Sequence, residues 1–137
     1  MDGRKKIRLK NYDYKSNGYY FITAVSKLRE NIFLGKEYLV EVELKDLQSK
    51  TPGVNLDYFV IMPNHIHAIL ILQNCDLHLG EIIRRLKAKV SYSFGQNVWQ
   101  ANYYEHVIRN ETALTKIREY IINNPQELLL KFDNFYK

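Results

Sequence analysis

The feature that most constrains the fold is a pair of apolar runs, Asn55–Met62 and His65–Leu72, separated only by Pro63 and Asn64. Proline and asparagine favour a tight turn, so the two runs are predicted to form the antiparallel strands of one hairpin. Their apolar content predicts burial on both faces, near the middle of a sheet. A chain built on this hairpin is therefore expected to fold around a sheet.

Two histidines, His65 and His67, open the second of these strands. Alternate residues of a strand point to the same face, so the two imidazoles are predicted to form a rigid pair. One interpretation is a pair of strand histidines without a ligand. An apolar hairpin gives imidazoles no packing reason to be there, which favours a metal site. Two ligands are too few for tight binding, so a third ligand is expected from another part of the fold.

The rest of the chain alternates strand and helix patterns. Strands are predicted over Gly18–Ser26 and Val98–Ile108, with a short edge strand over Asn31–Leu34. Helices are predicted over Lys36–Lys50, Asp76–Phe94 and from Asn110 or Thr112 to about Asn123. This order predicts an α+β fold with a ferredoxin-like antiparallel sheet and helices packed on one face.

Composition limits the class of protein. The 137 residues are expected to form one domain, 1–137, with a basic lead-in over 1–17 and a short amphipathic C-terminal tail over 126–137. No apolar run approaches the roughly 20 residues that span a bilayer, and no secretory signal is recognisable. Cys75 is the only cysteine, which points to the cytoplasm. A net charge of +5 and 11 tyrosines favour a polyanionic partner such as single-stranded nucleic acid.

The third predicted helix carries two further candidate residues, Tyr120 and Asn124. A spacing of four places them on one helical face. The asparagine amide oxygen suits a hard divalent ion, and the tyrosine phenol can act as a nucleophile. Taken alone, however, each is better explained structurally, Tyr120 at the edge of the core and Asn124 as a helix end before Pro125.

Three segments together resemble the HUH-type single-tyrosine transposases, and among them the REP-associated tyrosine transposases, relatives of the small single-strand insertion-sequence enzymes. The segments are Met62-Pro-Asn-His-Ile-His67, Trp99-Gln-Ala-Asn-Tyr-Tyr-Glu-His-Val-Ile-Arg109 and Ile117-Arg-Glu-Tyr-Ile-Ile-Asn-Asn-Pro125. The resemblance implies that His65 and His67 hold a divalent metal, Mg²⁺ or Mn²⁺. It also implies that Tyr120 is the nucleophile of a 5′-phosphotyrosine intermediate. Asn124 would be the third ligand, where relatives usually carry glutamine.

The resemblance further implies a DNA partner, single-stranded with hairpins or palindromic repeats, and leaves monomer and homodimer open. The Arg84, Arg85, Lys87 and Lys89 row on the second helix is a candidate phosphate-contacting surface, although such rows are ordinarily solvated. His106 is a candidate for a supporting role behind the metal ligands. Tyr103 and Tyr104 are rival nucleophiles, but their place on a strand favours packing or base stacking.

Two other functions compete with DNA cleavage and rejoining. One is a non-catalytic single-stranded nucleic-acid-binding module on a ferredoxin-like sheet, which uses tyrosines for stacking and needs no metal. It leaves the histidine pair, Tyr120 and Asn124 without a use. The other is a metal-dependent HUH nuclease of replication or plasmid transfer, for which the chain is small.

Overall fold

The computed structural model describes residues 17–136, and side chains as far as Lys131. The strands are β1 (Gly18–Ser26), β2 (Val54–Met62), β3 (His65–Leu72) and β4 (Trp99–Ile108), in the sheet order β2-β3-β1-β4 with every neighbouring pair antiparallel. The helices are the 3₁₀ turn η1 (Lys27–Arg29), α1 (Glu37–Lys50), α2 (Leu79–Phe94), α3 (Glu111–Asn123) and α4 (Pro125–Tyr136). The predicted α+β class with a ferredoxin-like antiparallel sheet is confirmed.

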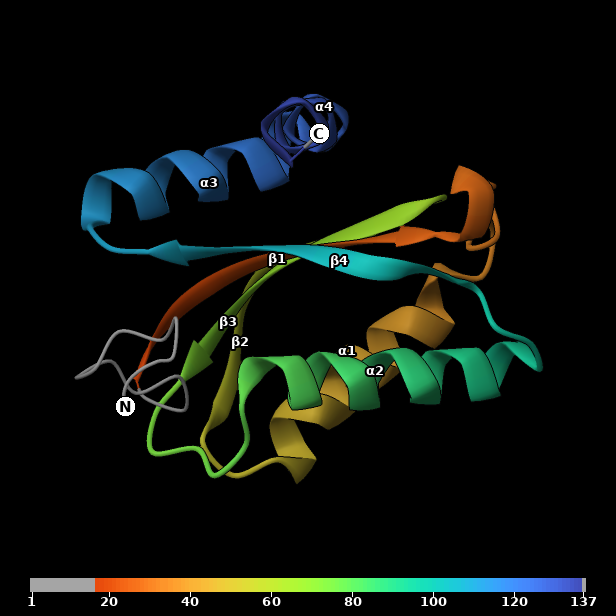
Figure 1. Cartoon of the computed structure of the whole chain (residues 1–137), viewed down its shortest axis with the longest axis horizontal. Coiled ribbons are helices and arrows are strands. Elements are labelled where there is room, and N and C mark those ends of the chain that lie inside the picture. Colours follow the sequence, from red (N-terminus) through yellow and green to blue (C-terminus); the bar gives the residue numbers. More distant parts are fainter. Residues whose placement is uncertain (1–16, 137) are drawn as a thin grey trace.

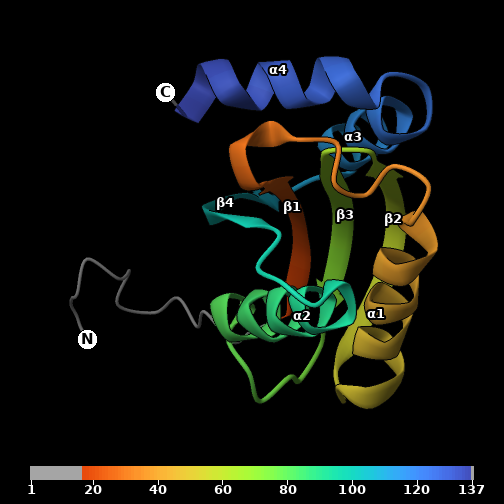
Figure 2. The ribbon, with the colours of Figure 1, turned by 90° about the vertical axis from the view of Figure 1, so that its right-hand side faces the viewer.

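The sheet is covered on both faces (Figures 1 and 2). Helices α1 and α2 pack side by side on one face, where Ile22 of β1 and Leu70 of β3 lie in the main core. Helices α3 and α4 lie over the opposite face, where Phe21 and Ile69 join a second, smaller core. The expectation of helices on one face therefore holds for α1 and α2, whereas the C-terminal pair covers the other side.

The two strands of the central hairpin differ in burial. Strand β3 lies between β1 and β2 and is buried along almost its whole length, as predicted. Strand β2 lies at the edge of the sheet and is mostly half-buried, so the prediction of burial on both faces is wrong for this strand. Its polar residues Asn55 and Asp57 mark the difference, because they interrupt the apolar pattern.

Several element boundaries also differ from the predictions. Residues Asn31–Leu34 form no strand, because Ile32–Gly35 is a turn that leads into α1. Helix α2 begins at Leu79 rather than at Asp76, after an extended residue at its N-cap. Of the two predicted caps of α3, Asn110 and Thr112, the structure uses Asn110, whose side chain accepts a hydrogen bond from the backbone N–H of Ala113.

The C-terminal segment predicted as a tail is the regular helix α4. The backbone N–H of Asn124 bonds the Tyr120 carbonyl, and the Asn124 carbonyl accepts from Leu128, so one asparagine ends α3 and begins α4. Leu128 is buried in the second core, which fixes α4 against α3. No helix among the described residues is long and apolar enough to cross a membrane.

Candidate active site

The histidine pair lies on β3, on the side of the sheet that faces α3 and α4. His65 and His67 are both fully buried, and their ring centroids are 4.7 Å apart with an angle of 72° between the ring planes. The strand forces both side chains to the same face, as predicted from their spacing. Burial makes the His67 imidazole costly to ionise, which favours its neutral form.

Both ring nitrogens of His67 are hydrogen-bonded. Nε2 lies 2.9 Å from the carbonyl oxygen of Pro125, and Nδ1 lies 2.7 Å from Oγ1 of Thr23. A carbonyl only accepts, so Nε2 carries the hydrogen and Nδ1 accepts from the threonine hydroxyl. Burial, and then the neighbouring His65, lowers the pKa of His67 to about 3, while the Pro125 hydrogen bond opposes this shift. The ring is therefore neutral at physiological pH.

The α3–α4 corner brings the other two predicted residues to this side of the sheet. Tyr120 and Asn124 line one pocket of about 410 Å³, together with Lys116, Glu119, Asn123 and Glu127. The histidine rings do not line this pocket. The connection to them is the backbone of Pro125, which directly follows Asn124 and contacts His67. Tyr120 and Asn124, the predicted nucleophile and third ligand, thus line the same pocket. Pro125, the residue after Asn124, contacts His67 of the histidine pair.

Tyr120 is held between its own helix and α4. Its ring packs against the second core, and Nζ of Lys131 lies 4.8 Å from the ring centroid. A side-chain hydrogen bond to Tyr120, and then the charge of the phenol, raises the pKa of Lys131. Lys131 was missed in the sequence analysis, because its helix was predicted as a tail.

A second unpredicted contact fixes α3 on the sheet. The guanidinium of Arg118 makes two 2.9 Å hydrogen bonds to the carboxylate of Asp57 on β2, and it lies 5.0 Å from the ring centroid of Tyr58. The bond to Asp57 raises the pKa of Arg118. Arg118 lies two residues before Tyr120, so this ion pair sets the position of the helix that carries the tyrosine. No local pattern links residues so far apart in the sequence.

His65, His67 and Asn124 are the residues predicted to hold a divalent ion. The residues that the structure describes contain no group of three or more His, Cys, Asp and Glu side chains able to hold a metal. Two imidazoles and the amide oxygen of Asn124 nevertheless offer nitrogen and oxygen donors of the kinds that divalent ions bind in proteins. Coordination by His67 through Nε2 would require its hydrogen to move to Nδ1 and the Pro125 carbonyl to withdraw. Coordination through Nδ1 would require Thr23 to move.

The remaining predicted candidates lie on two elements. On β4, His106 is exposed and pairs in register with Phe21, whose ring stacks on His67 at 5.5 Å. Tyr104 pairs with Thr23, which pairs in turn with His67, so these three side chains form one row on the same face. Tyr103 faces the main core, and burial, followed by Glu105, raises its pKa to about 12. This burial argues against Tyr103 as a nucleophile.

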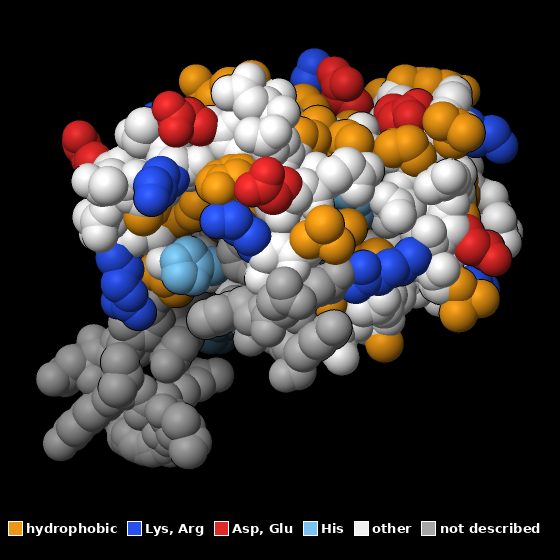
Figure 3. Space-filling model, turned by 90° about the horizontal axis from the view of Figure 1, so that it is seen from above, with side chains coloured by type: hydrophobic (Ala, Val, Ile, Leu, Met, Phe, Trp, Pro, Cys, Tyr) orange, Lys and Arg blue, Asp and Glu red, His pale blue; other side chains and the backbone are white. Residues whose placement is uncertain are grey.

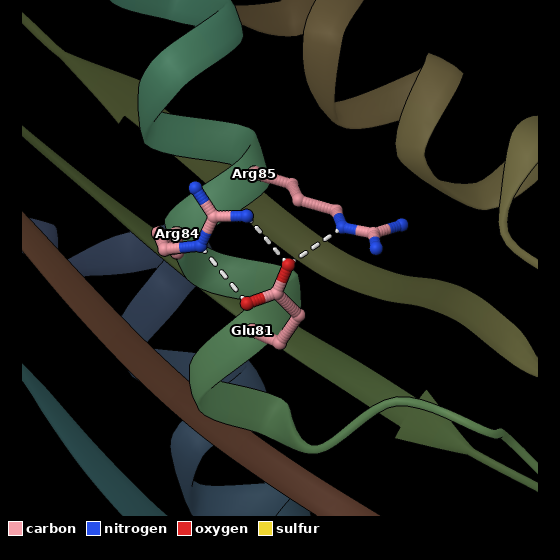
Figure 4. A network of polar contacts seen from close by, with 3 residues as sticks. All are labelled: Glu81, Arg84 and Arg85. Carbon is pink, nitrogen blue, oxygen red and sulfur yellow. Dashed lines mark hydrogen bonds and ion pairs between the residues drawn. The ribbon is translucent and has the colours of Figure 1, made fainter.

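The predicted phosphate-contacting row on α2 is largely engaged within the protein. Glu81 binds both Arg84 and Arg85 through its carboxylate (Figure 4). Lys87 turns inward, where Nζ donates to the carbonyls of Gln100 and Asn102 and burial lowers its pKa. Lys89 is exposed. On the α3–α4 side, basic and acidic side chains are interspersed with hydrophobic ones (Figure 3).

Comparison with known proteins places the chain in a family. The model of the family described as "Transposase IS200 like" matches residues 14–124. An uncharacterised protein of Haemophilus influenzae is 38% identical over 97% of this chain and 93% of its own length. The REP-associated tyrosine transposase of Escherichia coli is 26% identical over 82% of this chain and 68% of its own length.

Solved structures show the same fold. A REP-associated tyrosine transposase bound to a REP hairpin superposes with a TM-score of 0.74 at 23% identity, covering 88% of this chain and 73% of that one. A Deinococcus radiodurans protein described as a putative transposase superposes with a TM-score of 0.60 at 19% identity, covering 90% and 96%.

The match to the transposase family model places the chain in a class of enzymes that cut and transfer DNA strands. The chain belongs to the IS200-like transposase family, because the family model covers most of its length. The predicted transposase activity is thereby confirmed at the level of the family.

Proposed function

We propose that this transposase cleaves and rejoins single-stranded DNA through a covalent bond to Tyr120. The observation that carries the proposal is the α3–α4 corner, where Tyr120 and Asn124 line one pocket and Pro125 contacts His67. A nucleophile, an amide oxygen and two neutral imidazoles thus come from α3 and β3 to one side of the sheet.

The chemistry is a phosphoryl transfer. The Oη atom of Tyr120 attacks the scissile phosphorus, the bond from phosphorus to the 3′ oxygen breaks, and the phenolic proton is lost while the 3′ oxygen gains one. The products are a 5′-phosphotyrosine and a free 3′-hydroxyl. A 3′-hydroxyl of another strand can reverse the step, so DNA is rejoined without ATP. Lys131 of α4 lies next to the proposed nucleophile, with its Nζ 4.8 Å from the ring centroid of Tyr120.

The residues proposed to hold a divalent ion are His65, His67 and Asn124. When bound, Mg²⁺ or Mn²⁺ would supply positive charge to a phosphate oxygen. His106 and Tyr104 share the sheet face with the histidine pair, and we propose a supporting role for His106 and a base-stacking role for Tyr104. The roles of His106 and Tyr104 are proposed because both residues lie on the sheet face that carries the histidine pair.

The proposed substrate is DNA with a hairpin or a palindromic repeat. A structural relative is bound to a REP hairpin, and that fold is the fold of this chain. Arg84, Arg85 and Lys89 are proposed as phosphate contacts, since the two arginines and Glu81 together keep one positive charge on an exposed helix face. Lys87 is assigned to structure instead, because its ammonium is bound to backbone carbonyls.

Covalent trapping tests the proposal. The protein is mixed with labelled single-stranded hairpin oligonucleotides and Mn²⁺ and then separated on a denaturing gel. We expect a protein–DNA band that needs the metal, vanishes with Tyr120→Phe and persists with Tyr92→Phe, an exposed tyrosine on α2. A band that persists with Tyr120→Phe and vanishes with Tyr104→Phe would move the nucleophile. DNA binding without any band would favour the non-catalytic binding module.

A further inference from the structure

Asn64, in the turn between β2 and β3, makes two different hydrogen bonds with its side chain. Nδ2 donates to the carbonyl oxygen of Arg29 at 3.3 Å, and Oδ1 lies 2.7 Å from Nδ1 of His65. Only the amide nitrogen can donate to a carbonyl, so the contact with Arg29 determines which way the amide faces. The amide oxygen is thereby turned toward the histidine.

This orientation determines where His65 carries its hydrogen. An amide oxygen only accepts, so Nδ1 of His65 must be the donor of the 2.7 Å bond. In the neutral ring, Nε2 then carries the lone pair, and a lone pair is what a metal ligand must offer. A hydrogen bond on one ring nitrogen that leaves the other for the metal is the usual way in which proteins orient a histidine ligand.

The Arg29 carbonyl is presented by an unusual turn. Leu28 and Arg29 both have a φ of 56°, a left-handed conformation that residues other than glycine rarely adopt. The side chain of Leu28 is 81% exposed, so packing of this side chain does not explain the conformation. Such backbone persists only where the surrounding structure holds it, and it is concentrated at functional sites.

The surrounding structure does hold this turn against the hairpin. The backbone N–H of Ser26 donates to the carbonyl of Asn64, and the N–H of Phe33 donates to the carbonyl of Pro63, both at 2.9 Å. Together with the bond from Asn64 to Arg29, these contacts fix the segment 26–33 on both residues of the hairpin turn. The position of the Asn64 side chain is therefore set from two sides.

The other histidine is held in the opposite way. His67 carries its hydrogen on Nε2, which donates to the Pro125 carbonyl, and its Nδ1 accepts from Thr23. The two rings of the pair thus have opposite tautomers, imposed by different elements. Solvent alone would leave both rings as mixtures of tautomers, so a single tautomer for each ring is an observable consequence of these contacts.

We propose that Asn64 is a positioning residue that fixes His65 as the tautomer with hydrogen on Nδ1, and that the Leu28–Arg29 turn orients Asn64 for this task. The coordinating nitrogen of His65 is then Nε2. The last statement rests on the proposed metal-dependent function, whereas the tautomer itself does not.

Long-range ¹H–¹⁵N NMR on the metal-free protein at neutral pH tests the tautomer. A His78→Gln, His106→Gln background leaves only the buried pair to assign. We expect hydrogen on Nδ1 of His65 and on Nε2 of His67. Asn64→Ala should turn His65 into a mixture of tautomers, while Asn64→Asp, which keeps an acceptor, should preserve the Nδ1–H form. The control is Asn55→Ala, an exposed asparagine at the far end of β2, which should change neither ring.

Two outcomes would overturn the proposal. The first is hydrogen on Nε2 of His65 in the unsubstituted chain, which needs no variant and so decides the matter even if Asn64→Ala fails to fold. The second is a folded Asn64→Ala protein in which His65 keeps a single Nδ1–H tautomer.

Mn²⁺ titration followed by electron paramagnetic resonance tests the consequence for coordination. Asn64→Ala should weaken Mn²⁺ binding by about 10- to 100-fold, Asn64→Asp should retain most of the affinity, and Asn55→Ala should match the unsubstituted chain. Equal affinity in Asn64→Ala would overturn the assignment of Nε2 as the coordinating nitrogen. If the unsubstituted chain binds no Mn²⁺, the proposed metal fails, while the NMR result still decides the role of Asn64.

Discussion

The carbonyl oxygen of Pro125 lies 2.9 Å from Nε2 of His67, so the first residue of α4 contacts a ring nitrogen of the histidine pair. This contact links the C-terminal helix to the histidine pair through one backbone atom. A ligand that binds His67 at Nε2 competes with this contact. Binding of such a ligand would therefore displace the start of α4.

We predict that Mn²⁺ loosens the start of α4. If the ion takes Nε2 of His67, the ring hydrogen must move to Nδ1 and the Pro125 carbonyl must withdraw. The bond from the Leu128 N–H to the Asn124 carbonyl in the same turn should then open more often. Hydrogen-exchange mass spectrometry should show faster exchange in the peptide that spans the α3–α4 corner when Mn²⁺ is added. Unchanged or slower exchange in that peptide would contradict coordination at Nε2.

A second prediction concerns pH. The pKa of His67 is about 3 in the folded protein and about 6.5 in an unfolded chain, so below pH 6.5 the unfolded state binds more protons at this residue. Its contribution to stability is complete above pH 6.5 and is lost progressively as the pH falls toward 3. The free energy of unfolding should decline through this window by up to about 1.4 kcal/mol per pH unit from this group.

Urea denaturation at a series of pH values measures this decline. His67→Gln should flatten the profile, because glutamine keeps a donor for the Pro125 carbonyl and does not titrate. His78→Gln, which replaces an exposed histidine, should keep the slope of the unsubstituted chain. A slope that is the same in both variants would show that burial of His67 does not control acid stability.

A third prediction concerns the Arg118–Asp57 ion pair. Its side chains are 32% and 14% exposed, so the contact is partly shielded from water and its two hydrogen bonds are charge-assisted. Arg118→Ala should lower the free energy of unfolding by about 1–3 kcal/mol. Because α3 carries Tyr120, the same change should slow covalent trapping.

A double-mutant cycle with Asp57→Ala isolates the pair. The two single changes should be less than additive, since each removes the same interaction. The exposed pair Lys45–Glu41 on α1 provides the matched control, for which the coupling should lie near the low value of surface ion pairs, about 0–1 kcal/mol. Strict additivity at Arg118 and Asp57 would show that the contact does not hold α3 on the sheet.

Local patterns account for what the sequence predicted well. The bounds of β1 and β3 are as predicted, and Asn110 caps α3, because alternation, β-branched content and a capping side chain act over a few residues. Strand geometry alone also predicted that His65 and His67 point to the same face of the sheet. These features need no knowledge of the tertiary fold.

Features that depend on distant residues were not predictable in this way. The edge position of β2 depends on its pairing with β3 alone, and the second helical layer depends on where α3 and α4 pack. The contact between Pro125 and His67 joins residues far apart in the chain. From the sequence, Arg84 and Arg85 were predicted to belong to a row of charges that faces solvent. In the structure, Glu81, one helical turn earlier, binds both of them.

The fourth prediction separates two lysines of α2 that the sequence treats alike. Lys87 donates to the carbonyls of Gln100 and Asn102, whereas Lys89 is exposed. Lys87→Ala should lower the free energy of unfolding by about 1–3 kcal/mol, because partly buried carbonyls lose a charged donor. Lys89→Ala should change the free energy of unfolding by no more than about 0.5 kcal/mol. It should weaken hairpin binding instead, and the slope of the logarithm of the binding constant against the logarithm of the salt concentration should become shallower by about one. Chemical denaturation and binding titrations at several salt concentrations measure both effects, and a reversal of the two phenotypes would show that Lys87 leaves the carbonyls to contact DNA.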